Sequence, residues 1–273
     1  MNQVQMYMCI NFVSSIVIIW ANKHIFVHKY MTGTQLTILH FVVTFFALAV
    51  KNKNLPKADI SLKSAIPISI AFCGFVVFNN LSLQHNRLGT YQLLKVVTTP
   101  CIVAIQYGVY GVEVSRGKAL ALICVGVAIA TSASLEGVDG LAWGVCGVLA
   151  TSVYQIWVKT EQQRLKCSSE QLLMYQAPLG ALFLSLIEFT SHSSVVLGYE
   201  QYVWIMVSSV CAIFVNVSIF YIIGKTSPIT YNVLGHCKLC VILLSGYLLF
   251  NEAWNFQNIF GIAMALSGII MYY

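Results

Sequence analysis

The chain has 273 residues, of which 58% are hydrophobic and 9% are charged. About a quarter of the residues of an average soluble protein are charged, and the exterior of a soluble domain must face water, so this composition excludes a soluble globular protein. The net charge of +6 comes from dispersed lysine and arginine residues. It argues against a nucleic-acid-binding protein, because no cluster is dense enough to follow a phosphate backbone.

Apolar runs long enough to span a bilayer follow one another along the chain. A transmembrane helix needs about 20 mostly apolar residues, and the first run lacks the basic segment and cleavage site of a signal peptide, so we expect it to be retained. We predict an all-α membrane protein with ten transmembrane helices. The predicted spans are 4–22, 34–50, 64–84, 89–111, 117–135, 140–158, 169–188, 201–223, 228–250 and 255–273.

Lysine and arginine residues are divided unevenly between the two sets of alternate loops. Ten lie in the loops after spans 2, 4, 6 and 8, whereas only Lys23, Lys29 and Arg87 lie on the other side. Cytoplasmic loops carry an excess of basic residues, so both termini are predicted to be cytosolic. The net charge is explained by this topology and does not require an anionic partner.

Two lysines remain inside apolar runs, Lys95 in the fourth span and Lys238 in the ninth. An ammonium near the bilayer centre costs roughly 2.5–3.5 kcal/mol. One alternative is snorkelling to the interface, which is easier for Lys95 than for Lys238 because Lys95 is nearer the start of its span. We expect instead that both ammonium groups face a water-filled cavity and bind an anion.

Other polar residues recur at helical spacing from these lysines. Tyr91 lies four residues before Lys95, and Tyr231 lies seven before Lys238, so each tyrosine shares a helix face with its lysine. An interfacial aromatic belt is the alternative for the tyrosines. The other residues that we predict beside the lysines are Thr98, Asn232 and His236.

The spans of the two lysines are five apart, as expected of two five-span halves. An odd number of spans places the halves in opposite orientation, and inverted-repeat transporters bind their substrate near the midplane between the halves. We predict residues 1–135 and 140–273 as the halves of one transporter domain. Pro100, Pro178 and Pro228 would bend or break helices near such a site, although a bent helix needs no ligand.

Weaker candidates for the same cavity are polar residues within the other spans. Interhelical hydrogen bonding explains each of them equally well. These residues are Asn79, Asn80, Gln155, Tyr175, Gln176 and Asn216.

Four segments of the chain resemble one transporter family. They are FCGFVVFNNLSLQHNRLGTYQLLKVVTTP (72–100), GVLATSVYQIWV (147–158), YQAP (175–178) and NVSIFYIIGKTSPITYNVLGHCKLC (216–240). The chain is similar to the triose-phosphate translocator group of the drug/metabolite transporter superfamily, especially the E branch of solute carrier family 35. The resemblance implies ten helices in two inverted halves. It also implies exchange of sugar phosphates, or of nucleotide sugars against nucleotide monophosphates, across the Golgi or another secretory membrane.

The resemblance also implies roles for single residues. Lys95 matches a phosphate-binding lysine of the plastid members, Tyr91 stands at a family histidine, and Asn79 stands at a family threonine. Lys238 matches the lysine of a Lys-Arg pair in which Leu239 replaces the arginine. Because lysine offers a point charge and not the bidentate fork of arginine, a phosphodiester or another acidic solute is favoured over triose phosphate.

We therefore expect an antiporter for an organophosphate such as a sugar phosphate, nucleotide sugar or nucleotide. Its halves would rock against each other, and its lysines would neutralise the substrate. One alternative is a transport-silent membrane scaffold or regulator, in which the lysines pair with backbone carbonyls. A membrane enzyme using His40 or His236 lacks any supporting motif. We expect no cofactor and no metal; the expected partners are a small anionic solute and the lipid bilayer, with a homodimer left open.

Overall fold

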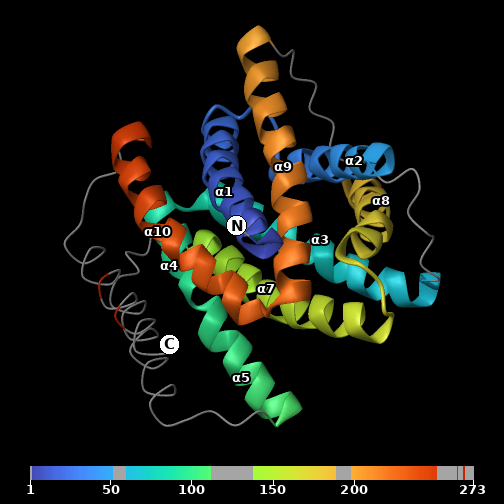
Figure 1. Cartoon of the computed structure of the whole chain (residues 1–273). Coiled ribbons are helices and arrows are strands. Elements are labelled where there is room, and N and C mark those ends of the chain that lie inside the picture. The colour runs from blue at the N-terminus through green and yellow to red at the C-terminus, as the bar shows by residue number, and fades with distance from the viewer. Residues whose placement is uncertain are drawn as a thin grey trace.

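The computed structural model describes residues 2–51, 60–111, 138–188 and 198–250, together with the single positions 263 and 267. Within these ranges every regular element is an α-helix (Figure 1). The helices are α1 (Gln3–Val27), α2 (Gly33–Lys51), α3 (Leu62–His85), α4 (Leu88–Val96), α5 (Thr98–Tyr110), α7 (Val138–Arg164), α8 (Ser169–Glu188), α9 (Tyr199–Lys225) and α10 (Pro228–Phe250).

Eight of the ten predicted spans coincide with described helices, and the fourth is divided into α4 and α5. The other two, 117–135 and 255–273, lie outside the described residues. Six segments of the described chain are long and apolar enough to cross a membrane, namely α1, α2, α3, the run from α4 to α5, α7 and α9. These helices make the chain an α-helical, multi-pass membrane protein. The count of ten helices and the inverted repeat stay predictions.

Some helices continue beyond the predicted ends of their apolar runs. The first span was predicted to end at residue 22, but α1 continues to Val27 and contains Lys23, which we had placed at a span end among the loop charges. Lys23 is 9% exposed. Its ammonium donates to the carbonyl oxygens of Leu83, at 3.2 Å, and Asn86, at 2.7 Å, where α3 ends. The prediction was wrong here because a paired lysine can stay inside a helix end, where it satisfies unbonded carbonyls.

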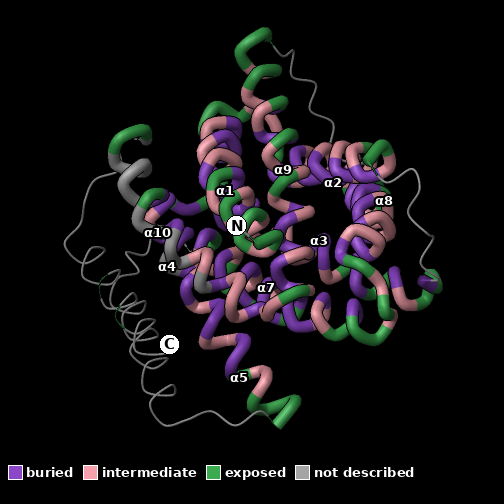
Figure 2. Tube along the Cα trace, in the orientation of Figure 1, coloured by how far each residue is buried: buried purple, intermediate pink, exposed green. Residues whose placement is uncertain are grey.

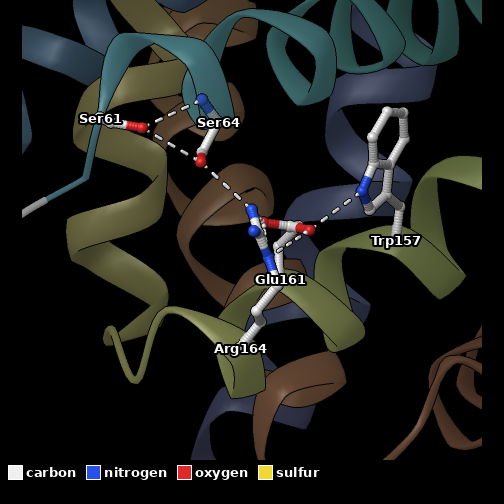
Figure 3. Close-up of polar contacts among 5 residues, drawn as sticks. All are labelled: Ser61, Ser64, Trp157, Glu161 and Arg164. Carbon is white, nitrogen blue, oxygen red and sulfur yellow. Dashed lines mark hydrogen bonds and ion pairs between the residues drawn. The ribbon is translucent and has the colours of Figure 1, made fainter.

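The predicted loop between the spans 140–158 and 169–188 is likewise shorter in the structure, because α7 continues through Arg164. Figure 3 shows the polar cluster that stabilises this last turn. Glu161 is 6% exposed and accepts hydrogen bonds from Arg164 Nη2 at 2.6 Å and from Trp157 Nε1 at 3.3 Å. Arg164 Nη2 also donates to Ser64 Oγ, at 3.2 Å, near the start of α3. The cluster thereby connects the end of α7 to α3.

Replacing Arg164 with alanine is expected to destabilise this end of the protein. Glu161 would be left buried with one charge partner removed. We expect a small loss, because Arg164 is largely exposed and solvent screens its pairing with Glu161. Thermal unfolding of the purified protein measures the loss. Since Glu161→Gln removes the uncompensated carboxylate, the double variant should melt higher than Arg164→Ala; a lower melting temperature would contradict this account.

The prolines have different effects on their helices. Pro100 has no N–H for the carbonyl of Val96, so the helix is weakened one turn before the proline, and α4 and α5 are separated at Val97. The predicted break beside Lys95 is therefore confirmed. Pro178, in contrast, lies inside the continuous helix α8. Pro228 is the first residue of α10, where its missing N–H is harmless.

The helices pack in crossing pairs: α1 on α9, α3 on α7, and α2 on α8. Helices from both predicted halves are thus interleaved. Stacked aromatic rings fill one core, with centroids 4.5 Å apart for Phe41 and Phe72 and 5.4 Å apart for Phe72 and Tyr154. At Gly180, a Cβ atom would lie 2.7 Å from the Phe41 ring, so α8 needs a glycine there to approach α2 closely. Buried residues gather where the helices cross, whereas the far ends of α5 and α9 are exposed (Figure 2).

Candidate functional site: a polar cavity between the helices

A cavity of about 170 Å³ lies between α1, α2, α3, α4, the start of α5, α7, α9 and α10. It has room for several water molecules. Seven of the eight residues that the sequence suggested for the site line this cavity: Asn79, Tyr91, Lys95, Thr98, Tyr231, Asn232 and Lys238. The eighth, His236, belongs to α10, but its side chain is outside the described part of the structure. The structure thus brings seven predicted residues together, and their part in binding stays a prediction.

Lys95 lies in the last turn of α4, just before the break at Val97. Its side chain is half-buried, and its ammonium lies 4.6 Å from the centroid of the Tyr91 ring, a favourable cation–π distance. Among the described residues Lys95 makes this ring contact without a side-chain hydrogen bond. The donors of this ammonium are therefore available to a solute in the cavity.

Lys238 reaches the cavity from α10 and is 5% exposed. Its ammonium donates to Asn11 Oδ1 at 2.8 Å and to Ser15 Oγ at 3.0 Å, both on α1, and lies 5.7 Å from the centroid of the Tyr231 ring. These bonds hold the ammonium inside the protein, so Lys238 does not snorkel to the interface. The two lysines face one cavity, but they are not equally bonded.

Asn11 extends this contact to a third helix. Its amide nitrogen donates to Ser218 Oγ on α9 at 2.8 Å, so α10, α1 and α9 are joined by one buried polar network. Farther along α1, Asn22 accepts a hydrogen bond from Ser208 on α9. His40 Nε2 lies 2.8 Å from the same Ser208 hydroxyl. His40 is thus a buried member of a helix-joining network, and this contact gives no support to its use as an enzyme residue.

The amide residues of the cavity wall also connect helices. Asn79 donates to Thr151 Oγ1 at 2.9 Å, which joins α3 to α7. Asn232 on α10 donates to Gln155 Oε1 on α7 at 2.9 Å, and the Gln155 amide nitrogen lies 3.5 Å from Asn232 Oδ1. Lining the cavity and bonding between helices, which we had treated as alternatives, therefore occur in the same residues.

The weaker candidates separate into two groups. Asn80 and Asn216 line the cavity, and they donate to Thr37 Oγ1 at 2.7 Å and Thr44 Oγ1 at 3.1 Å on α2. Gln176 instead lies in the packed interior, where it accepts a hydrogen bond from the Tyr154 hydroxyl at 2.8 Å. The predicted amide residues of the wall therefore come from α3, α7, α9 and α10.

The sequence analysis missed several residues at the cavity or in contact with its lysines. Ser15, Asn22 and Gln92 line it, and Asn11 bonds to Lys238. A signal was present for α1: positions 11, 15 and 22 are polar and lie on a single face of the helix, at intervals of four and seven residues. Gln92 follows Tyr91 directly and carries no charge, so its place in an apolar run is a weaker signal than that of Lys95.

Membrane helices that enclose a polar cavity with basic side chains define a class, the solute transporters. No family model matches the chain. Known proteins identify the group. The chain is 34% identical to UDP-xylose transporter 2 of Arabidopsis thaliana, over 95% of this chain and 78% of that protein. It is 33% identical to UDP-xylose transporter 3, over 95% and 77%, and 28% identical to UDP-rhamnose/UDP-galactose transporter 2, over 96% and 80%, both of the same plant.

The chain therefore belongs to the nucleotide-sugar transporter group of the drug/metabolite transporter superfamily, the group to which the sequence resemblance pointed. It is a transporter and not an enzyme. A solved crystal structure superimposes on the chain with a TM-score of 0.64, over 96% of both chains and at 12% identity. That likeness concerns the fold alone. The relatives give no support to the scaffold alternative.

Proposed function

We propose that the chain is an antiporter that exchanges a UDP-linked sugar for a nucleoside monophosphate across a secretory-pathway membrane such as that of the Golgi. The observation that carries the proposal is that Lys95 and Lys238 reach one cavity from α4 and α10. Each phosphate of a UDP-linked sugar is bonded to a sugar on one side and to the other phosphate on the other, and carries one negative charge. Two ammonium groups match two such charges without the bidentate fork of an arginine. The names of the relatives supply the UDP-linked sugar.

We further propose alternating access by two inverted halves, residues 1–135 and 140–273. In this arrangement α1, α2 and α3 of the first half correspond to α7, α8 and α9 of the second. The contact of α1 with α9 then corresponds to the contact of α7 with α3, and the contact of α2 with α8 corresponds to itself. The packing of the helices has this reciprocal pattern. The lysine contacts follow it too: Lys23 of α1 bonds to the end of α3, and Lys159 of α7 donates to the Gly224 carbonyl at 2.7 Å, at the end of α9.

Counterflow in proteoliposomes tests the exchange. Purified protein is reconstituted with UMP inside the vesicles, and radiolabelled UDP-xylose or UDP-galactose is added outside. We expect uptake that depends on internal UMP and stops when the internal pool is spent. Equal uptake into vesicles without UMP would replace exchange by uniport. The scaffold alternative would be favoured if neither compound is taken up and none of the nucleotides raises the melting temperature of the protein.

We also propose that both termini lie in the cytosol, which the uneven division of basic residues between the loops supports. Cysteines introduced at Gln163, which is exposed near the end of α7, and at Tyr199, which is 86% exposed at the start of α9, should lie on opposite sides. A membrane-impermeant maleimide should label Gln163→Cys once the plasma membrane alone is permeabilised, and Tyr199→Cys only after the organelle is opened. Burial raises the pKa of the native Cys167 thiol, so background labelling near Gln163 should be slow at neutral pH. The reverse order of labelling would overturn the orientation.

A further inference from the structure

One side chain of the cavity wall has an unused donor. Gln92 lies on α4 and lines the cavity, and the residue is 4% exposed. Within the described part of the chain, its amide nitrogen has no hydrogen-bond partner. The other amide residues of the wall, such as Asn79 and Asn232, each donate to a neighbouring helix. Gln92 thus differs from them in that its amide nitrogen bonds to no other helix among the described residues.

An unpaired buried amide is unfavourable for folding. A buried donor without a partner has lost its bond to water and gained none in return, and native proteins contain few such groups, each of which calls for an explanation. A partner that occupies the cavity only when substrate is bound would explain Gln92. A carboxamide offers both a donor and an acceptor, so its natural partner is a neutral group that can also donate and accept a hydrogen bond.

The position of Gln92 indicates which part of the substrate its side chain would contact. Gln92 and Lys95 are three residues apart on α4, and such residues are neighbours on a helix surface, with Cβ atoms about 5–6 Å apart. If Lys95 holds a phosphate, Gln92 meets the group attached to that phosphate. In a UDP-linked sugar that group is a sugar ring, the ribose on one side and the transferred sugar on the other, whereas the base lies beyond the ribose.

We propose that Gln92 hydrogen-bonds a sugar hydroxyl next to the phosphate held by Lys95, and so contributes to substrate specificity. The proposal rests on the proposed function, because it takes a nucleotide sugar as the ligand. The hydroxyl belongs to the ribose or to the transferred sugar, and both have the chemistry that a carboxamide recognises.

Binding to purified Gln92→Leu distinguishes the two sources. We expect its affinity for UDP-xylose to fall about 2- to 10-fold, the loss for one neutral hydrogen bond. If the ribose is the partner, UMP should weaken equally, and 2′,3′-dideoxyuridine monophosphate should bind the variant and the wild type alike. If the transferred sugar is the partner, UDP-xylose should weaken and UMP should not.

The ligand-free melting temperature separates this role from a structural one. Because Gln92→Leu removes an unpaired buried amide, the ligand-free variant should melt at the wild-type temperature or above it. Gln92→Met repeats the test if the leucine variant folds poorly, and Gln163→Leu, at an exposed position outside the cavity, is the matched control. Unchanged affinity for UDP-xylose and UMP would overturn the inference, as would an equal loss for UMP and its dideoxy analogue, which would indicate the base. If the wild type binds none of these compounds, the proposed function itself fails.

Discussion

Lys95→Ala is expected to abolish exchange of UDP-linked sugars and to leave the melting temperature of the ligand-free protein unchanged. The ammonium of Lys95 makes a ring contact with Tyr91 and, among the described residues, no hydrogen bond, so its removal breaks little of the structure. A phosphate in the cavity would lose a charge-assisted bond that contributes about 1.5–3 kcal/mol, which corresponds to about 10- to 150-fold in affinity. Counterflow of UDP-xylose against UMP and thermal unfolding measure the two effects.

The control for Lys95→Ala is Lys225→Ala, because Lys225 is exposed at the end of α9 and should be replaceable without effect on exchange. Lys95→Arg keeps the charge and should restore part of the affinity. Exchange at the wild-type rate by Lys95→Ala would show that the lysine is not part of the binding site.

Lys238→Ala is expected to abolish exchange as well, but also to lower the free energy of unfolding. The ammonium of Lys238 bonds to Asn11 and Ser15 in the ligand-free protein, and truncation removes this charged donor from both buried acceptors. We expect a loss of about 1–3 kcal/mol. Thermal unfolding of Lys238→Ala, Asn11→Ala and the double variant measures it. The single effects should not add, because the residues are in direct contact.

The comparison of the two alanine variants is informative because equivalent positions in two halves would suggest equal losses. The equivalent places of the two lysines in the sequence suggest equal losses from the two substitutions. The contacts predict equal losses of exchange, but a loss of stability for Lys238→Ala alone. A melting temperature of Lys238→Ala equal to that of Lys95→Ala would indicate that the bonds to α1 contribute nothing to stability.

The positions of the helices were predictable because bilayer length and apolar composition determine them. Eight spans agree with described helices, and the break near Lys95 was visible in Pro100. The lysines of the cavity were predictable for the opposite reason: a cation in an apolar run is costly enough to require an explanation. For each of these predictions, a single proline or lysine within an apolar run was sufficient evidence.

The helix ends and part of the wall were not predictable. In the sequence Lys23 and Glu161 look like loop residues, because their partners cannot be seen there. Lys23 bonds to Asn86, far away along the chain, and Glu161 bonds to Arg164, one turn away. Asn11 and Gln92 carry no charge, so their burial is cheaper and the sequence signal weaker. The bond from Lys238 to Asn11 joins residues 227 positions apart, and only the packing of α1 against α10 reveals it.

The bonds of Lys23 and Lys159 to the ends of α3 and α9 have a consequence for sequence divergence. In both cases the acceptor is a main-chain carbonyl oxygen, which every amino acid supplies. Substitutions at Leu83 or Asn86 that keep the end of α3 in place therefore leave these acceptors present. At Gly224 a Cβ atom would lie 2.9 Å from Ser169 Oγ, so the end of α9 is more constrained than the end of α3, where the attachment of α1 depends on the identity of the lysine alone.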